Sequence, residues 1–241
     1  MKKIKNWLLD LNFLRKFLGW KVFRPKFSAG LKLEVVDEIE AERVLVLSPH
    51  PDDETFGCGG TLKKISGKIR IIFLTDGAKG ADPVVREEEA KKAAQILGIK
   101  NLQFLRYPDG ELAEDQEKIK KIKKIIEDFR PKKIFVPILT DTHLDHQATA
   151  KILRKALLKS KFSGEIWSYE IWSPLFANRI VNIDETEKER AMQAYQSQIG
   201  ERDYVSAVKG LNQYRAKINK AGSSAEAFFV CKKSLYLKFF K

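Results

Sequence analysis

Histidines and acids are clustered in two short segments of this sequence, in a pattern that could bind a metal ion. Residues 48–54 read S-P-H-P-D-D-E, and residues 140–146 read T-D-T-H-L-D-H. The chain of 241 residues has three histidines, and all of them fall in these two segments. Packing or chance would rarely distribute histidines in this way. The two segments are therefore the first candidates for a chemical function.

The residue types in these segments suit a hydrolytic metal centre. Imidazole nitrogens and carboxylate oxygens are ligands of zinc and of other borderline divalent ions. A catalytic centre uses three protein ligands and leaves one position open to water. Two histidines and one aspartate would supply that number. A bound divalent ion lowers the pKa of water to about 7, and a free carboxylate nearby could accept the proton as general base.

Both segments follow apolar runs that are predicted to be buried strands. From about residue 42, short apolar runs alternate with amphipathic stretches, which predicts an α/β fold, a Rossmann-like three-layer sandwich with a mostly parallel central sheet. Ligands of such sheets bind at the carboxyl ends of the strands, where the two segments would meet. We expect strands at 44–47, 69–74, 102–105, 134–138, 165–171 and 225–231, and helices at 55–65, 86–97, 114–129, from near 146, and at 184–198.

The first 30 residues are expected to form a basic amphipathic extension before a domain that spans residues 31–241. They contain eight Lys or Arg and one Asp, about half of the net charge of +13. Their apolar residues recur at helical spacing. Such a helix could dock on the domain or on a neighbouring subunit, or lie at a membrane surface. No run is long enough to span a membrane, and charges interrupt the apolar stretch, so a secretory signal is not expected.

The remaining composition narrows the class of protein. The two cysteines, Cys58 and Cys231, provide neither a disulfide framework nor a Cys-based zinc site and favour the reducing cytoplasm. Lysines interleave with glutamates as on a solvated helix face, and no nucleic-acid-binding motif occurs. We therefore expect a cytoplasmic protein without a nucleic-acid partner, located at the inner face of the membrane if the N-terminal helix binds lipid.

Residues 50–54 (H-P-D-D-E) and 143–146 (H-L-D-H) also carry a family resemblance. They are similar to the two signature motifs of the LmbE/PIG-L family of zinc-dependent N-acetylglucosamine de-N-acetylases. The resemblance covers about residues 42–232 and implies the fold predicted above. It continues through shorter motifs at 74–77 (L-T-D-G), 86–90 (R-E-E-E-A), 108–110 (P-D-G) and 195–198 (Y-Q-S-Q).

The resemblance implies a role for each residue of the first motif. His50, Asp53 and His146 would be the ligands of Zn²⁺ or of another divalent metal such as Fe²⁺. Asp52 would be the general base and would later protonate the leaving amine. Asp52 could also cap the following helix, which would not exclude catalysis. Glu54 is expected to lie behind the ligands or to be a charge in the first helical turn.

The second motif and two further positions complete the implied site. His143 would stabilise the tetrahedral oxyanion, and Asp145 would orient His143 and favour its charged form. Arg86 and Asp109 resemble family positions that contact sugar hydroxyls. Arg86 could instead be a solvated helix residue, and Asp109 could belong to a Pro-Asp-Gly turn.

The implied substrate is an N-acetylglucosamine-containing conjugate, a small molecule that would be split into acetate and a free amine. We hypothesise a lipid- or phosphate-linked sugar, because residues 1–30 could hold the protein at a membrane. A homo-oligomer is an open alternative. A metal-dependent hydrolase of another amide or of a carbamoyl group, and a non-catalytic family member, also remain open. A nucleotide-binding Rossmann protein is disfavoured, because the glycines at 57–60 do not form G-x-G-x-x-G and follow acids that would repel a pyrophosphate.

Overall fold

The computed structural model describes residues 32–200 and 203–239. The chain divides into two units, Met1–Leu33 and Glu34–Lys241, and every element described below belongs to the second. The helix predicted within residues 1–30 lies outside the described residues. Within the described ranges, no helix combines the length and the apolar character that crossing a membrane requires.

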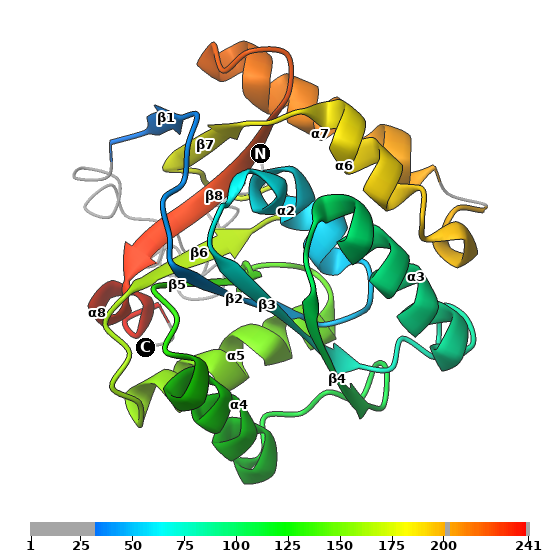
Figure 1. Ribbon diagram of the computed structural model, residues 1–241. Helices are drawn as coiled ribbons and strands as arrows, with labels where there is room; N and C mark the ends of the chain where they lie inside the picture. Colours follow the sequence, from blue (N-terminus) through cyan, green and yellow to red (C-terminus); the bar gives the residue numbers. More distant parts are fainter. Residues whose placement is uncertain (1–31, 201–202, 240–241) are drawn as a thin grey trace, which may run out of the picture. The chain divides into compact units, whose positions relative to one another are not determined.

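A central sheet of eight strands is formed by the described residues (Figure 1). The strand order is β1-β7-β8-β6-β5-β2-β3-β4. All neighbouring strands are parallel except where β8 pairs with β6 and β7, which confirms the mostly parallel sheet. The strands are β1 Glu34–Val36, β2 Arg43–Ser48, β3 Lys68–Thr75, β4 Asn101–Tyr107, β5 Lys133–Pro137, β6 Glu165–Tyr169, β7 Arg179–Asn182 and β8 Ala225–Lys232.

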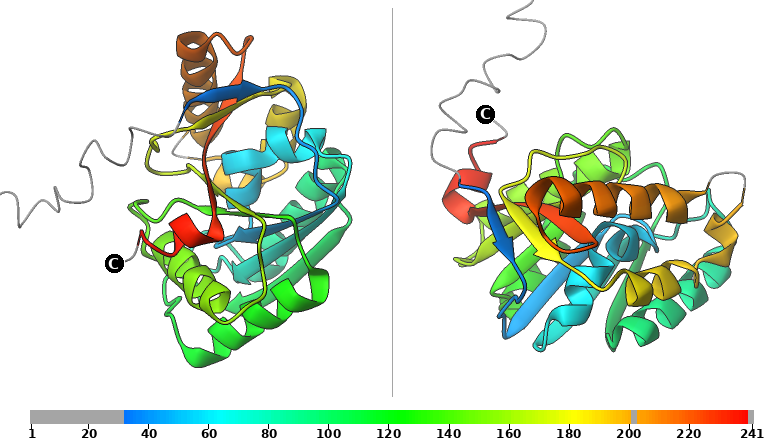
Figure 2. Two further views of the ribbon diagram at one scale, coloured as in Figure 1. Left: turned by 90° about the vertical axis from the view of Figure 1, so that its left-hand side faces the viewer. Right: turned by 90° about the horizontal axis from the view of Figure 1, so that it is seen from above.

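Helices cover both faces of this sheet, as Figures 1 and 2 show. The helices α2, α3 and α6 pack together on one face, whereas α4 and α5 pack together on the other. The three-layer prediction is therefore confirmed. The helices are α2 Asp53–Lys64, α3 Pro83–Leu97, α4 Gln116–Phe129, α5 Leu144–Leu158, α6 Glu185–Met192, α7 Tyr204–Asn219 and α8 Lys233–Tyr236, with a 3₁₀ helix, η2, at Gln196–Gln198.

The burial of the strands explains their sequence. The four residues 44–47 of β2 and the four residues 71–74 of β3 are fully buried. Parallel strands covered on both faces read as continuous apolar runs rather than as alternating ones. The edge strand β4 is half-buried over most of its length. The apolar runs found in the sequence are thus the strands at the centre of the core.

Some elements differ from those expected. The helix predicted at 184–198 ends at Met192, because the chain turns there and buries Tyr195, and η2 follows. The short strands β1 and β7 and the helix α7 were not predicted. Only three residues of α7 are buried, Val205, Asn212 and Ala216, so its apolar periodicity is weak.

The order of the strands places a topological switch point at the site. The chain adds β3 and then β4 on one side of β2, and it returns to add β5 on the other side. A parallel sheet that changes direction in this way opens a crevice at the carboxyl ends of the two strands at the switch. The two segments rich in histidine and acid follow β2 and β5. The fold therefore places both of them at this switch point of the sheet.

Candidate active site

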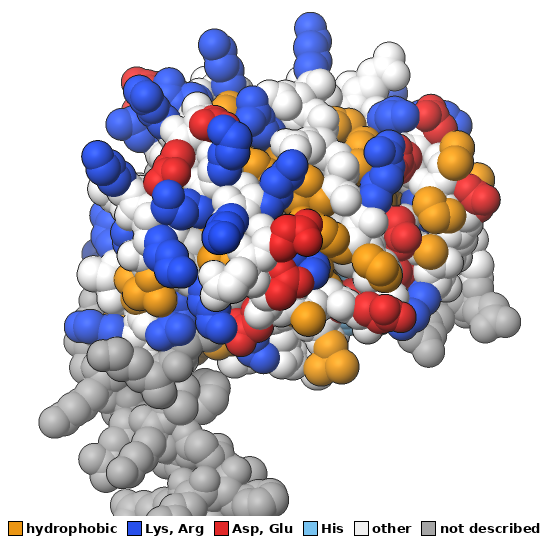
Figure 3. All heavy atoms as spheres, turned by 90° about the horizontal axis from the view of Figure 1, so that it is seen from below, with side chains coloured by type: hydrophobic (Ala, Val, Ile, Leu, Met, Phe, Trp, Pro, Cys, Tyr) orange, Lys and Arg blue, Asp and Glu red, His pale blue; other side chains and the backbone are white. Residues whose placement is uncertain are grey.

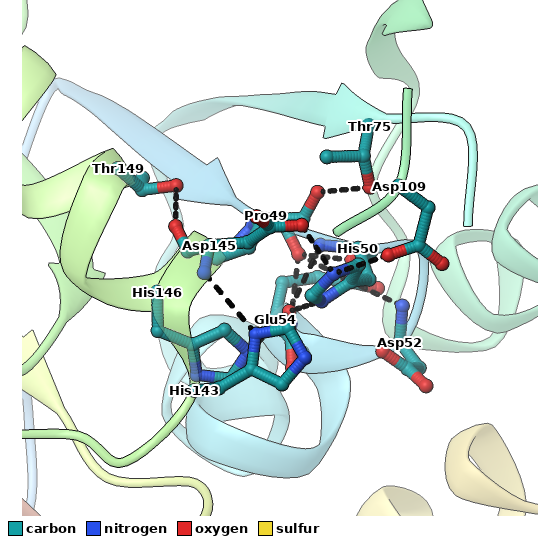
Figure 4. A network of polar contacts seen from close by, with 12 residues as sticks. Pro49, His50, Asp52, Glu54, Thr75, Asp109, His143, Asp145, His146 and Thr149 are labelled. Carbon is teal, nitrogen blue, oxygen red and sulfur yellow. Dashed lines mark hydrogen bonds and ion pairs between the residues drawn. The ribbon is translucent and has the colours of Figure 1, made fainter. Parts of the chain in front are cut away.

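The two predicted segments meet at the carboxyl ends of β2 and β5 (Figure 4). Asp53 is the first residue of α2, and His146 lies in the first turn of α5. The ring centroids of His50 and His146 are 5.4 Å apart, and those of His143 and His146 are 4.8 Å apart. Figure 3 shows a histidine side chain at the surface between acidic and hydrophobic side chains, while Lys and Arg gather on another part of the same face. At least one histidine of the site therefore reaches the surface on this side.

Each of the three predicted metal ligands has one side-chain atom close to the same point. Oδ2 of Asp53 lies 3.0 Å from Nδ1 of His50 and 3.2 Å from Nε2 of His146. Burial raises the pKa of Asp53, but the charge and hydrogen bonds of His146, followed by those of His50, lower it by more. The pKa of Asp53 is therefore held well below its usual range. One carboxylate oxygen and two imidazole nitrogens thus converge, which is a suitable donor set for a divalent ion such as zinc.

The second nitrogen of each of these imidazoles points to a carboxylate. Nε2 of His50 lies 3.1 Å from Oδ1 of Asp109 and 3.2 Å from Oδ2 of Asp145. Nδ1 of His146 lies 3.3 Å from Oδ1 of Asp141. Burial lowers the pKa of His146, but Asp53 and Asp141 raise it to about 9. Histidines that bind metals commonly donate their second N–H to a carboxylate, which fixes the ring.

His146 supplies a further sign that the site fits a metal ion. Its ring is fully buried, and within the described part of the chain neither ring nitrogen has a hydrogen bond of acceptable geometry. Buried polar atoms are nearly always satisfied by the protein or by a bound species. Two sets of three potential ligand atoms also lie within 4.8 Å of one another, namely His50, His143 and His146, and His50, Asp109 and Asp145. The described residues therefore contain a His/Asp group that could hold a metal ion.

Asp52 has a strained backbone and does not cap α2 with its side chain. It occupies the N-cap position, but its carboxylate makes no capping hydrogen bond and lies 3.1 Å from Nη2 of Arg86. Its φ is 150°, a positive value that is uncommon for a residue with a Cβ atom. Burial raises the pKa of Asp52, and Arg86 opposes this increase. Strain of this kind persists where the surrounding structure enforces it, often at functional sites.

Arg86 and Asp109, the two predicted sugar contacts, both lie near the centre, and Asp109 also belongs to the Pro-Asp-Gly turn offered as its alternative, which the N–H of Glu111 closes on the carbonyl of Pro108 at 3.3 Å. Arg86 is only 2% exposed, so it is not a solvated helix residue. Its Nε and Nη1 have no hydrogen-bond partner among the described residues. Asp109 accepts the backbone N–H of Lys79 at 3.0 Å and contacts His50. Their role in binding a sugar stays a prediction.

His143 and Asp145 do not form the side-chain pair that the family resemblance implies. The Asp145 carboxylate accepts the N–H groups of Gly110 at 2.7 Å and Leu112 at 3.2 Å, and it contacts His50. Nδ1 of His143 instead accepts the backbone N–H of Asp145 at 3.2 Å (Figure 4). The proton of a neutral ring is then at Nε2.

The pKa of His143 is shifted in the direction opposite to the one that a charged ring would require. Burial lowers the pKa of His143, and His146 and His50 lower it further. The structure therefore favours a neutral ring with an Nε2–H donor rather than an imidazolium held by Asp145. The physical reason is that the Asp145 carboxylate is already bound by the backbone after β4 and by His50.

Asp141 is a site residue to which the sequence analysis gave no role. It is almost fully buried, accepts the backbone N–H of His143 at 2.9 Å and that of Trp172 at 3.1 Å, and lies against His146. It therefore connects three parts of the site. Its position two residues before His143, in the same acidic segment, was the signal that could have identified it.

Glu54 anchors the first loop from behind the ligands, as expected. It is fully buried and accepts hydrogen bonds from Tyr195 Oη at 2.6 Å, Thr55 Oγ1 at 2.8 Å and Ser48 Oγ at 3.1 Å. Burial raises the pKa of Glu54 to about 7. Through Tyr195 this carboxyl joins residues 50–54 to the later Y-Q-S-Q motif.

These features define a Rossmann-like α/β protein with a candidate His/Asp metal centre at the switch point of its sheet. The family model of PIG-L, GlcNAc-PI de-N-acetylase, matches residues 45–157. Together with the relatives described next, this match shows that the chain belongs to the PIG-L (LmbE-like) family.

Two curated relatives match about half of the chain. Diacetylchitobiose deacetylase of Thermococcus kodakarensis is 33% identical over 123 residues, which are 45% of this chain and 46% of the relative. A probable N-acetyl-alpha-D-glucosaminyl L-malate deacetylase 2 of Bacillus anthracis is 33% identical over 133 residues, which are 47% of this chain and 58% of the relative. The chain thus spans only about half of the length of these relatives.

Two solved structures match over more of the chain. The conserved protein TT1542 of Thermus thermophilus is 31% identical with a TM-score of 0.69, over 77% of this chain and 92% of that one. N,N'-diacetylchitobiose deacetylase of Pyrococcus horikoshii has a TM-score of 0.73 over 98% of this chain and 97% of that one. The latter identity is 23%, so this likeness supports the fold.

Proposed function

We propose that this protein is a metal-dependent de-N-acetylase, which hydrolyses the N-acetyl group of an N-acetylglucosamine-containing conjugate to acetate and a free amine. One observation carries the proposal, the convergence of His50 Nδ1, Asp53 Oδ2 and His146 Nε2, with a carboxylate behind each imidazole. The names of the relatives, a diacetylchitobiose deacetylase and a glucosaminyl-malate deacetylase, support an amino-sugar substrate.

His50, Asp53 and His146 would hold Zn²⁺ or another divalent ion such as Fe²⁺. When bound, the ion would supply Lewis-acid polarisation of the acetyl carbonyl and acidify a water molecule. Asp145 and Asp141 would keep the rings of His50 and His146 in the orientation needed for binding, because each carboxylate lies beside the second nitrogen of its histidine, at 3.2 Å and 3.3 Å, and would accept its N–H.

Asp52 is the proposed general base. Its carboxylate is adjacent to Asp53 in the chain, and burial raises its pKa, which makes it a stronger proton acceptor than an exposed aspartate. Arg86, 3.1 Å away, keeps the carboxylate in place and limits that increase. After removing a proton from water, Asp52 would deliver it to the nitrogen of the leaving amine.

His143 is the proposed oxyanion donor. A neutral ring with its proton on Nε2 can donate a hydrogen bond to the acetyl oxygen as negative charge develops there. The backbone N–H of Asp145 and the buried Asp141 fix this ring and its backbone in position. Arg86 and Asp109 are the proposed contacts to sugar hydroxyls.

Acetate release from N-acetylglucosamine conjugates by metal-loaded protein tests the proposal. We expect Asp52→Asn to lower the rate by about 10²–10⁴-fold, the contribution typical of general acid–base catalysis, with the metal content per chain unchanged. His146→Ala should lose both metal and activity. Asp115→Asn, at the N-cap of α4, where asparagine can keep the capping hydrogen bond, is the matched control.

The possible outcomes separate the alternatives. Metal binding without acetate release from any conjugate would move the assignment to another amide or to a carbamoyl substrate. The absence of bound metal would overturn the proposal.

A lipid- or phosphate-linked substrate at the inner face of a membrane is a finer part of the proposal. Its support is the concentration of positive charge in residues 1–30, since such segments bind anionic lipid. Flotation with anionic vesicles should decrease when Lys2, Lys3 and Lys5 are replaced by Glu in the full chain. Equal flotation of both proteins would remove this part. Sedimentation of the same samples would determine whether the protein is a homo-oligomer.

A further inference from the structure

We propose that Trp172 is a stacking platform for a sugar ring of the substrate, a subsite beyond the metal centre. The inference deepens the proposed function, because it assumes a carbohydrate ligand. Trp172 lies in the connection between β6 and β7 and is 45% exposed. Because β6 is parallel to β5, this connection begins at the same edge of the sheet as the segment that carries His143 and His146.

A single carboxylate joins Trp172 to the centre. Its backbone N–H donates to Oδ2 of Asp141 at 3.1 Å. Oδ1 of the same carboxylate lies 3.3 Å from Nδ1 of His146 and accepts the backbone N–H of His143 at 2.9 Å. The backbone of Trp172 therefore has a fixed, short separation from both histidines.

The turn that carries Trp172 is also held from its other side. Glu170, at its start, pairs with Arg215 of α7 through Oε1–Nε at 3.0 Å and Oε2–Nη2 at 2.6 Å. Glu170 Oε2 accepts the N–H of Leu175 at 2.7 Å, and Arg215 Nη2 donates to the carbonyl of Leu175 at 2.8 Å. Bidentate pairs of this kind fix geometry as well as adding energy. Such bracing holds the residues on both sides of Trp172, as a binding subsite requires.

The indole ring itself has support on one side. The ring of the half-buried Tyr204 lies 5.3 Å away at 87°, an edge-to-face contact. No described residue accepts a hydrogen bond from Nε1 of Trp172. A pyranose ring presents C–H groups on one face, which suit the negative face of an aromatic ring, and hydroxyls at its rim, which suit an indole N–H.

A comparison with Trp167 argues against a purely structural role. Trp167, five residues earlier on β6, is 2% exposed and packs between Phe135 and Phe228. Trp172 is not enclosed in this way, and its backbone is bound to Asp141 of the candidate site. Because Trp172 and His146 contact the same Asp141 carboxylate, the proposed stacked ring is one close to the N-acetylated ring.

The test compares a disaccharide with a monosaccharide in the metal-loaded full chain. Trp172→Ala should lower kcat/KM for N,N'-diacetylchitobiose about 10-fold, mainly through KM, because the aromatic face on which the second sugar ring would stack is removed. N-acetylglucosamine should lose no more than about 2-fold, and Trp172→Phe should restore most of the loss. Tyr214→Ala, at an exposed aromatic residue of α7, is the matched control. Metal content should stay unchanged, because alanine keeps the N–H that binds Asp141.

Binding without turnover separates this inference from the proposed activity. The affinity of the Asp52→Asn protein for N,N'-diacetylchitobiose is measured by calorimetry with and without Trp172→Ala. Weaker binding in the double variant supports the platform even if no conjugate is hydrolysed. Equal binding overturns the platform and leaves the deacetylase assignment intact. A change in oligomeric state with Trp172→Ala, without a change in sugar binding, also overturns it and assigns the indole to a subunit interface.

Discussion

Two buried clusters of charge in this protein differ in how completely their atoms are paired. In the first, Glu226 of β8 accepts the N–H of Gly60 at 2.9 Å, the N–H of Thr61 at 2.8 Å and Lys188 Nζ at 2.7 Å. Lys188 is fully buried and Glu226 nearly so. Each oxygen of the Glu226 carboxylate accepts at least one of these bonds, so both buried charges are paired within the protein, although the nearby hydroxyl of Thr61 has no partner among the described residues.

The second cluster is the candidate active site, and its own atoms do not complete it. Both ring nitrogens of His146 and two guanidinium nitrogens of Arg86 lack hydrogen bonds to described residues, and Asp52 is strained. Native structures satisfy nearly all buried polar groups, and they tolerate strain mainly where function requires it. The difference indicates that the first cluster stabilises the fold, whereas the second is arranged for a bound ion and substrate.

The two clusters are connected through α2. Glu226 binds backbone N–H groups in the second half of this helix, and the same helix carries Asp53 at its first residue. A Cβ atom at Gly60 would lie 2.7 Å from the side chain of Ile183, so α2 is closely packed here. The Lys188–Glu226 cluster thus holds α2, the helix that places Asp53 in the candidate active site.

The largest effect on stability is expected from Lys188→Met. This change leaves Glu226 buried without its cationic partner, and breaking a buried pair in this way costs about 3–5 kcal/mol of unfolding free energy. Urea unfolding measures the loss. The double variant Lys188→Met, Glu226→Gln should recover part of it. A loss below about 1 kcal/mol, as for an exposed pair, would contradict the structural role of this cluster.

A smaller and different effect is expected from Asp141→Asn. Asparagine keeps the shape but not the charge behind His146, and loss of such a partner typically lowers metal affinity about 10–100-fold. Competition with a chelating dye measures the affinity, and Asp115→Asn serves as control. Unaltered affinity would mean that Asp141 only holds the backbone of His143 and Trp172, and the contrast between the two clusters would weaken.

The smallest effect is expected from a third, partly exposed cluster at Glu165. Burial raises the pKa of Glu165, but the hydrogen bond and charge of Lys133, together with hydrogen bonds from Trp167 and Lys232, have a larger opposite effect. They lower this pKa to about 2. The stabilisation is therefore present above the ordinary glutamate pKa and is lost as the pH falls toward 2. Solvent screening limits it to less than about 1 kcal/mol. Urea unfolding of the parent and Glu165→Gln at a series of pH values should show the difference at pH 7 and none near pH 2, and a constant difference would exclude this origin.

The sequence predicted the parts of this structure that depend on local pattern. The apolar run of β2 and the motif after it located His50 and Asp53, and the strand–helix alternation implied that His146 would meet them. The orientation of Asp145 could not be predicted in this way. It depends on the N–H groups of Gly110 and Leu112, 35 and 33 positions away, and residue periodicity contains no information on such contacts.

The same limit explains the other differences. Asp141 acts through its contact with Trp172, which belongs to a connection that has no regular pattern of its own. The helix α7 is positioned partly by Arg215 pairing with Glu170, an ion pair between residues 45 positions apart. Polar contacts between distant segments, rather than apolar periodicity, determine these features.

The placement of the centre between β2 and β5 has a consequence for the order of folding events. His50 and Asp145 are 95 positions apart in the chain, and the segment between their strands contains β3, α3, β4 and α4. Contacts across such a span are slow to form. A nascent chain therefore cannot assemble the centre until β5 and the start of α5 have left the ribosome. We expect a bound ion to slow the rate of unfolding while leaving the rate of folding nearly unchanged, because its contacts form after the transition state.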